Sequence, residues 1–145
     1  MSNRRNFIKK SALGTLGVSS ILSCDELNNV NIKKTYPRII STWNHGLEAN
    51  QKAWEVLKNG EGGLSAVEKG VKVSEADPKI RSVGYGGYPD RDGIVTLDAC
   101  IMDKNSNCGS VSFLQNIKHP ISVARHVMED TPHVMLSGKG ALDFA

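Results

Sequence analysis

The sequence is poor in aromatic residues and contains no long apolar run. Aromatic side chains make up 6% of its 145 residues, hydrophobic residues 39% and charged residues 23%. This balance is typical of a soluble globular protein and excludes a disordered or membrane-spanning chain. The longest apolar stretch, SALGTLGVSSIL at residues 11–22, has 12 residues, whereas a transmembrane helix needs about 20. The length of the chain fits one domain.

Most of the chain has no excess of basic over acidic side chains, although the formal net charge is +3. The excess comes from Arg4, Arg5, Lys9 and Lys10, which lie in a leading segment without acidic side chains. The remainder is close to neutral and has no lysine or arginine run with interleaved aromatic residues. A nucleic-acid partner is therefore excluded, because proteins that bind nucleic acids neutralise phosphates with a basic surface.

Local catalytic and cofactor motifs are also missing. The sequence lacks a G-x-S-x-G nucleophile elbow, and SGKGA at 137–141 lacks the spacing of a P-loop. Three histidines recur every seven residues, but prolines interrupt the helix that would align them as metal ligands. The histidines are His119, His126 and His133, and the prolines are Pro120 and Pro132. No metal ion or organic cofactor is implied.

Residues 1–24 have the order of an export signal. The positive segment MSNRRNFIKK precedes the apolar stretch, and Cys24 follows it. The arginine pair resembles a twin-arginine signal, and ILSC resembles a lipobox, which makes Cys24 a candidate lipidation site. The alternative is an ordinary signal peptide with an incidental cysteine. Either leader predicts a periplasmic or cell-envelope protein that meets a membrane only through the leader or a lipid anchor.

The polar residues 25–36 show no periodicity and are expected to form a linker. After it, RIIST at 38–42 predicts a short strand leading to Trp43. Two amphipathic helices follow and are expected to cover one face of a sheet. The first carries Ala49, Ala53, Val56 and Leu57 and ends at Asn59 and Gly60, and the second carries Leu64, Val67 and Val71 and fades before Asp77.

A β-hairpin is predicted next. In residues 94–103 alternate side chains form one apolar face, while Asp98 lies on a mixed face between a threonine and a cysteine. DKNSN at 103–107 is typical of a turn, and CGSVSFL at 108–114 predicts the second strand.

Two cysteines, Cys100 and Cys108, fall in the adjacent strands of this hairpin. An exported protein can form disulfides. Pairing depends on a strand register that the sequence pattern does not define, and free buried cysteines are common. We therefore expect two reduced, half-buried thiols.

A further helix is predicted between two prolines, with Pro120 in its first turn and Pro132 beyond its end. HVML at 133–136 predicts a short strand, and GALDFA at 140–145 predicts the start of another helix. Because that helix stops at Ala145 with no cap or glycine, we expect the chain to be truncated there.

Five motifs follow one another within residues 37–145. They are STWNHG at 41–46, SVGYGGYPDRDG at 82–93, TLDACIMD at 96–103, NIKHPISVARHVME at 116–129 and TPHVML at 131–136. In this order and spacing they resemble the glycosylasparaginases, also called aspartylglucosaminidases. The resemblance implies an α/β fold, namely about half of the four-layer αββα sandwich of the N-terminal nucleophile hydrolases. Residues 37–145 would be the N-terminal part of that domain.

Members of this superfamily are made as one precursor that cuts itself and frees a threonine, whose α-amine can activate its own hydroxyl. The resemblance places that threonine downstream of Ala145. No catalytic residue is therefore expected in this chain, which alone should be inactive and should need the β-subunit half of the same precursor. The resemblance also implies dimers of αβ pairs.

Three residues match substrate-binding positions of the family. The resemblance places Trp43 at the bottom of the substrate funnel; the alternative is a tryptophan of the core. It places Asp98 on the sugar side of glycosyl-asparagine; the alternative is an aspartate that is solvated or caps a turn. A carboxylate can accept hydrogen bonds from sugar hydroxyls. His45 replaces the phenylalanine of bacterial members and adds donors and titratability. The glycines of residues 84–87 are expected to serve close packing of the loop.

Three functions remain open. The first is hydrolysis of the amide between asparagine and a sugar, as in N4-(β-N-acetylglucosaminyl)-L-asparaginase. The second is the reaction of a plant-type L-asparaginase or isoaspartyl peptidase, although those relatives open with a glycine-rich segment where this chain has STWNHG at 41–46. The third is a non-catalytic surface lipoprotein.

Overall fold

The computed structural model describes residues 36–145. The expected export signal at 1–24, with Cys24, lies outside the described residues, as does all of the expected linker except Tyr36. Residues Arg38–Ala145 form one compact unit of helices and a small sheet, which confirms the α/β class. Within the described part of the chain, no helix is both long and apolar enough to cross a bilayer.

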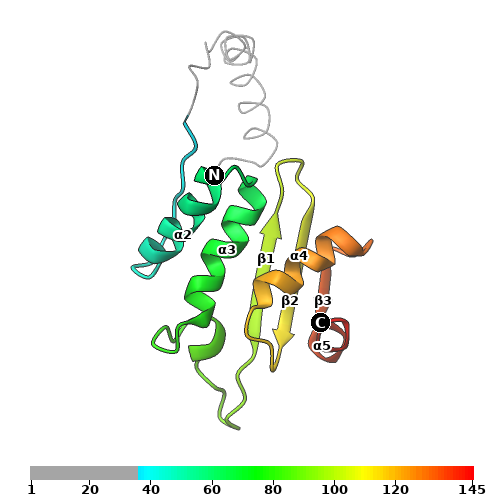
Figure 1. Ribbon diagram of the computed structural model, residues 1–145. Coiled ribbons are helices and arrows are strands. Elements are labelled where there is room, and N and C mark those ends of the chain that lie inside the picture. Colours follow the sequence, from blue (N-terminus) through cyan, green and yellow to red (C-terminus); the bar gives the residue numbers. More distant parts are fainter. Residues whose placement is uncertain (1–35) are drawn as a thin grey trace, which may run out of the picture. The chain divides into compact units, whose positions relative to one another are not determined.

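Two helices lie side by side at one edge of this unit (Figure 1). Helix α2 spans Gly46–Lys58 and helix α3 spans Gly63–Ala76, where the apolar spacing predicted them. Gly60 follows α2 with φ of 82°, the left-handed conformation that commonly ends a helix. Gly70 allows close approach of the two helices, because a Cβ there would lie 2.8 Å from the carbonyl oxygen of Ala49.

A small apolar cluster fills the space between α2 and α3. Its buried members are Ala53, Val56 and Ala66, with Ile39 and Leu57 packed against them. Val67 was predicted to share the buried stripe but is 51% exposed. The prediction was wrong because α3 turns its small residues toward α2, which leaves Val67 on the outside.

Residues 38–42 do not form the predicted strand. Ile39 packs against the helices, whereas the side chain of Ile40 is 90% exposed. A strand requires a neighbour whose backbone groups complete its hydrogen bonds, and no described strand pairs with this segment. The β-branched composition of the segment is therefore insufficient to make it a strand.

Three strands form one mixed sheet in the order β1–β2–β3. Strand β1 spans Leu97–Met102, β2 spans Cys108–Leu114 and β3 spans Met135–Ser137. The first two form the predicted antiparallel hairpin, and β3 runs parallel to β2. Asp103 stabilises the hairpin turn, since its carboxylate accepts hydrogen bonds from two backbone N–H groups of the turn. The last strand begins two residues later than predicted.

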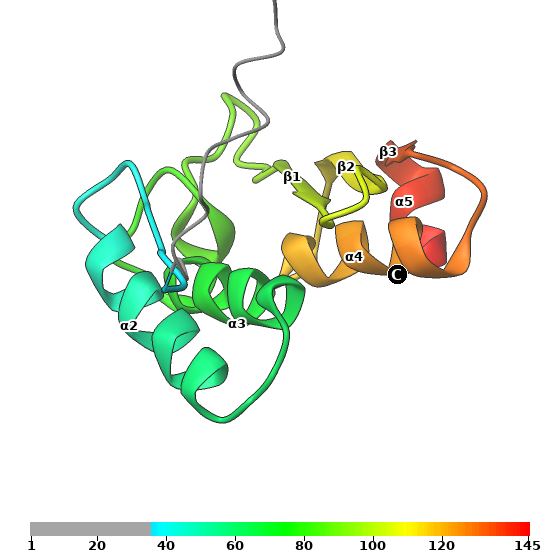
Figure 2. The same ribbon diagram turned by 90° about the horizontal axis from the view of Figure 1, so that it is seen from above.

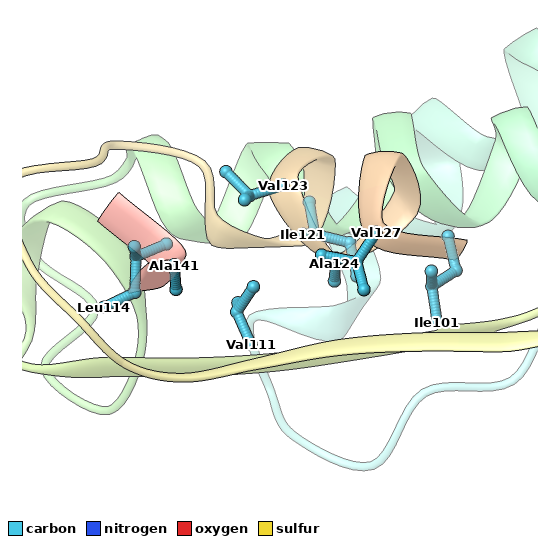
Figure 3. Packing of buried hydrophobic residues seen from close by; sticks show 8 residues of the cluster. All are labelled: Ile101, Val111, Leu114, Ile121, Val123, Ala124, Val127 and Ala141. Atoms are coloured by element: carbon cyan, nitrogen blue, oxygen red, sulfur yellow. The ribbon is translucent and has the colours of Figure 1, made fainter. Parts of the chain in front are cut away.

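Helix α4, Pro120–Asp130, lies across one face of the sheet, and helix α5, Gly138–Phe144, packs against the same side of β2 (Figures 1 and 2). Both helices occur where the sequence predicted them. The main core lies between these helices and the sheet (Figure 3). Its members are Ile101, Val111, Leu114, Ile121, Val123, Ala124, Val127 and Ala141.

The expectation that the first two helices cover the sheet was only partly right. Helix α4 occupies that position, and α3 lies beside α4 (Figure 2). Helix α3 reaches the edge of the main core through Leu64 and Val71, while α2 packs on α3. The helices thus form a layer on one face of the sheet, and the opposite face is open in the described part of the chain.

The open face carries the predicted mixed set of side chains. Along β1, Ile101 is buried on the helical side, while Asp98, Cys100 and Met102 are exposed on the other side. Both Cys100 and Cys108 are free, as expected, but only Cys108 is half-buried. The strand register makes them diagonal neighbours, a separation of about 7–8 Å between Cα atoms, which is beyond the usual reach of a disulfide.

The glycine-rich loop is closely packed, as expected, and Gly84 lies against the end of α3. Gly84 has φ of 58°, and a Cβ on it would overlap the backbone of Glu75. A Cβ on Gly86 would lie 2.7 Å from the carbonyl oxygen of Pro78. A larger residue at Gly84 would therefore push the loop away from α3, and one at Gly86 would push it away from the segment 78–80.

Gly109 in β2 sets the separation between the sheet and α4. A Cβ there would overlap the carbonyl oxygen of Ala124 and lie 2.6 Å from the backbone nitrogen of Met128. We expect Gly109→Ala to lower the free energy of unfolding by about 1–3 kcal/mol, as overpacked substitutions do. Thermal unfolding of the chain, followed by circular dichroism, measures this loss as a lower Tm.

Gly140→Ala in α5 is the matched control, because a Cβ there meets nothing within 4 Å. It should leave the Tm unchanged or raise it slightly, since alanine favours helix over glycine. Equal Tm values for Gly109→Ala and Gly140→Ala would contradict the proposed packing constraint.

Candidate functional site

Asp98 lies at an irregularity of the β1–β2 ladder. Between two successive paired positions β2 has one residue more than β1, which defines a β-bulge. In this bulge, Ser112 and Phe113 of β2 lie opposite Asp98 of β1. Phe113 has a left-handed conformation with φ of 53°, and its backbone N–H donates to Oδ1 of Asp98 at 2.9 Å. The Asp98 carboxylate therefore replaces a backbone acceptor that the bulge removes.

The Asp98 side chain is held by a hydrogen bond and is also accessible to solvent. Its Oδ1 is held by the Phe113 N–H, the residue is exposed, and Oδ2 accepts no hydrogen bond from the described residues. A carboxylate held in this way is already oriented to accept hydrogen bonds from a ligand. Stabilisation of the bulge and contact with a ligand are compatible roles for the same side chain.

A cleft of about 310 Å³ runs along the edge of β1. Its walls come from β1, from the end of α3 with the glycine-rich loop, and from the start of α4. The polar residues among its lining are Glu75, Ser82, Thr96, Asp98 and Cys100. The structure thus brings Asp98 into the same cleft as a second carboxyl group that the sequence analysis did not select.

Trp43 lies in a tight turn immediately before α2. The backbone N–H of Gly46 donates to the carbonyl oxygen of Trp43 at 2.8 Å. The tryptophan side chain is 69% exposed, so it is not a core residue of the described part of the chain. An exposed indole is available for contact with a ligand or with another segment.

The imidazole of His45 is directed to α3. His45 occupies the N-cap position of α2 without a side-chain capping hydrogen bond, and its Nδ1 lies 3.0 Å from Oγ of Ser74 in the last turn of α3. Its Nε2 is buried and has no hydrogen-bond partner among the described residues. Neither His45 nor Trp43 lines the cleft that contains Asp98. The three predicted residues therefore occupy two separate places in this unit.

Glu75 is the buried carboxyl group of this region, with 3% exposure. Its Oε1 accepts the backbone N–H of Ile121 at 3.0 Å, and its Oε2 lies 3.3 Å from Nδ1 of His119. Burial raises the pKa of Glu75 to about 7, while burial and the nearby Lys72 and Lys118 lower the pKa of His119. Both shifts favour the neutral forms, so burial weakens the ion pair that Glu75 and His119 could otherwise form.

Sequence reasoning missed Glu75, although a signal was present. Glu75 lies four residues after Val71 and so continues the apolar stripe of the second helix. A carboxyl group on a buried stripe needs a hydrogen-bond partner. That partner, Ile121, is 46 residues away in the chain, and no local pattern identifies it.

The histidines spaced by seven residues do not form a metal centre. His119 contacts Glu75, whereas Nδ1 of His126 lies 2.7 Å from the carboxylate of Asp130. Among residues 36–145, no three histidine, cysteine, aspartate or glutamate side chains are grouped so that they could hold a metal ion.

The sequence model of a family described as Asparaginase matches residues 30–145, which include all five motifs. The chain belongs to this family. An Elizabethkingia miricola protein named N(4)-(Beta-N-acetylglucosaminyl)-L-asparaginase is 58% identical over 147 residues, which cover 99% of this chain and 43% of that protein. A Mus musculus protein named N(4)-(beta-N-acetylglucosaminyl)-L-asparaginase is 43% identical over 110 residues, which cover 75% of this chain and 32% of that protein.

These similarities confirm the resemblance to glycosylasparaginases within the asparaginase family. The chain spans less than half the length of the curated relatives it matches. Asp98 and the turn with Trp43 both fall inside the matched range of the asparaginase family.

Burial of Glu75 predicts a pH dependence of stability. Its pKa is raised from 4.5 in the unfolded chain to about 7, so the folded chain binds this proton more tightly. The contribution of Glu75 to the free energy of unfolding is therefore complete below pH 4.5 and falls as the pH rises toward 7. Glu75→Gln cannot ionise and keeps an acceptor for Ile121. We therefore expect the free energy of unfolding of Glu75→Gln, measured relative to that of the parent, to rise by on the order of 1–3 kcal/mol as the pH is raised from 4.5 to 8.

Urea unfolding at a series of pH values measures this difference. His119 has the opposite effect, because its lowered pKa makes stability rise with pH, and this contribution is shared by parent and variant. Glu55→Gln, at a solvent-exposed position of α2, is the control and should follow the parent. Parallel pH profiles for Glu75→Gln and the parent would show that the carboxyl is not buried as described.

Proposed function

We propose that this chain forms part of the substrate pocket of a glycosylasparaginase, which hydrolyses the amide between asparagine and N-acetylglucosamine. The observation that carries the proposal is the anchored carboxylate of Asp98, an exposed residue that lines the cleft along the edge of β1 and whose Oδ1 accepts the Phe113 N–H. Asp98 lies in the motif whose aspartate faces the sugar in the family that the chain resembles. The names of the two relatives support the same reaction.

In this proposal the nucleophile is a threonine supplied downstream of Ala145. Its α-amine takes the proton of its hydroxyl, and the oxygen attacks the carbonyl carbon of the asparagine side-chain amide. The amine returns the proton to the departing glycosylamine, and water then releases aspartate from the ester. The present chain contributes binding and orientation, with Asp98 accepting hydrogen bonds from the sugar and Trp43 lying beside the nucleophile.

The open face of the sheet supports a four-layer αββα arrangement. Met102 of β1 and Met135 of β3 are 63% and 53% exposed, so large apolar side chains of the sheet are left uncovered in the described part of the chain. We propose that the β-subunit half of the same precursor packs a second sheet against this face. Pairing of the resulting αβ units into dimers is proposed from the family resemblance.

We also propose that the protein is exported to the periplasm or cell envelope. The support is the leader of residues 1–24, with its arginine pair, its short apolar stretch and Cys24 as a candidate lipid anchor. A twin-arginine route, which carries folded proteins, would allow the precursor to fold and cleave itself before translocation.

A second candidate is hydrolysis of free asparagine or of a β-aspartyl peptide. The departure at His45, where bacterial glycosylasparaginases carry a phenylalanine, favours this candidate, because it changes how the turn that carries Trp43 is held. The two reactions share the attack on the amide and differ in the leaving group. Comparing glycosyl-asparagine with asparagine as substrates separates them.

The chain of 145 residues alone should not release aspartate from N-acetylglucosaminyl-asparagine, since it contains pocket residues without the nucleophile. Aspartate release is measured with a coupled assay on the purified chain. A longer precursor that includes the downstream threonine is the positive control. Activity of the 145-residue chain in the absence of that segment would refute the proposed division of roles.

Two variants of Asp98 in the longer precursor separate its two roles. Asp98→Asn keeps Oδ1 as the acceptor for the Phe113 N–H but loses the charge, whereas Asp98→Ala loses both. If the carboxylate binds the sugar, both variants should lose about tenfold to a hundredfold in kcat/KM on glycosyl-asparagine and less on asparagine. The Tm should fall only for Asp98→Ala. Self-cleavage should be unchanged in both.

The measurements are kcat/KM on both substrates and the Tm of each variant. Equal losses on the two substrates, together with a lowered Tm for both variants, would reject the sugar contact. That result would leave Asp98 with its role in stabilising the bulge.

A further inference from the structure

The turn of residues 41–46 is closely packed. The N–H of Gly46 donates to the carbonyl oxygen of Trp43, and a Cβ on Gly46 would overlap the side chain of Ser41. The indole of Trp43 nevertheless extends outward and is 69% exposed. The direction of this side chain therefore depends on how the turn is attached to the rest of the unit.

His45 provides such an attachment. Its Nδ1 reaches Oγ of Ser74 at 3.0 Å across 29 residues of sequence, which joins the start of α2 to the end of α3. Ser74 is 5% exposed, and the next residue, Glu75, is bound to the N–H of Ile121 at the start of α4. The imidazole is thus held by a buried and well-connected part of the fold.

The same geometry argues against direct contact between His45 and a ligand. Nδ1 is engaged by Ser74, and Nε2 is buried. Neither ring nitrogen is directed to solvent beside Trp43 in this arrangement. A phenylalanine at this position would keep a flat ring of similar size but would lose the hydrogen bond to Ser74.

We infer that His45 is a positioning residue: its hydrogen bond to Ser74 fixes the turn of residues 41–46 and thereby the orientation of Trp43. The orientation of Trp43 stands on the contacts described above, while its effect on a substrate rests on the proposed function.

The first test uses Trp43 as its own reporter. The chain contains two tryptophans, so Trp54→Phe leaves Trp43 as the single fluorophore. In this background we compare His45→Asn, whose amide lies where Nδ1 was, with His45→Gln, whose amide lies where Nε2 was. Ser74→Ala removes the partner, and circular dichroism confirms that each variant is folded.

Time-resolved fluorescence anisotropy reports the local motion of the indole. We expect the amplitude of the fast decay to rise about twofold in His45→Gln and Ser74→Ala, and to stay near the parent value in His45→Asn. The double variant His45→Gln, Ser74→Ala should show no further increase, because both changes remove the same bond. Equal motion in the Asn and Gln variants, or an unchanged indole in Ser74→Ala, would overturn the inference.

A second readout uses the longer precursor and its activity on glycosyl-asparagine. His45→Gln and Ser74→Ala should each lower kcat/KM by about twofold to tenfold, the effect of one neutral hydrogen bond, while His45→Asn retains activity. Activity retained by His45→Gln and lost in His45→Asn would show that Nε2 serves the ligand, and would overturn the inference. If Trp43 becomes mobile while activity is unchanged in all variants, the positioning role stands and the proposed role of Trp43 in the reaction fails.

Discussion

One buried carboxyl group, that of Glu75, joins the pair of helices α2 and α3 to the part of the unit that contains the sheet. Its oxygen accepts an N–H at the start of α4, the helix that covers the sheet. A buried acceptor of this kind replaces an intrahelical partner that the first turn of a helix lacks. Burial raises the pKa of Glu75 to about 7, and below this pH the protonated carboxyl limits the cost of removing the group from water.

The residues around Glu75 carry the candidate site. Gly84 packs against the backbone of Glu75 and so places the glycine-rich loop that leads into β1. Ser74, the preceding residue, holds His45 and with it the turn of Trp43. Asp98 then lies on β1 at the bulge, in the cleft whose other wall includes Glu75. The end of α3 thus fixes both places from which this chain would reach a substrate.

Sequence patterns predicted the elements whose formation depends on local spacing. The apolar period of α2 and the alternation of β1 are properties of one short segment, and both occur as expected. Features that depend on distant partners were not predictable. The segment 38–42 has the composition of a strand but no described neighbour, and the Glu75 contact with Ile121 joins residues far apart in the chain.

The site residues came from the motif resemblance rather than from periodicity. The alternation placed Asp98 on the mixed face, but the bulge that anchors its carboxylate depends on strand register, which the sequence did not reveal. The substitution at His45 was visible in the sequence. Its contact with Ser74 was not, because the packing of two helices brings these residues together.

A crystal structure of the longer precursor with glycosyl-asparagine bound tests the central claim most directly. We predict that the sugar lies against the edge of β1, with Oδ2 of Asp98 within hydrogen-bond distance of a sugar hydroxyl and Oδ1 still bound to the Phe113 N–H. A ligand bound away from Asp98, or an Asp98 carboxylate with both oxygens engaged by protein groups, would contradict the assignment of this cleft to the substrate.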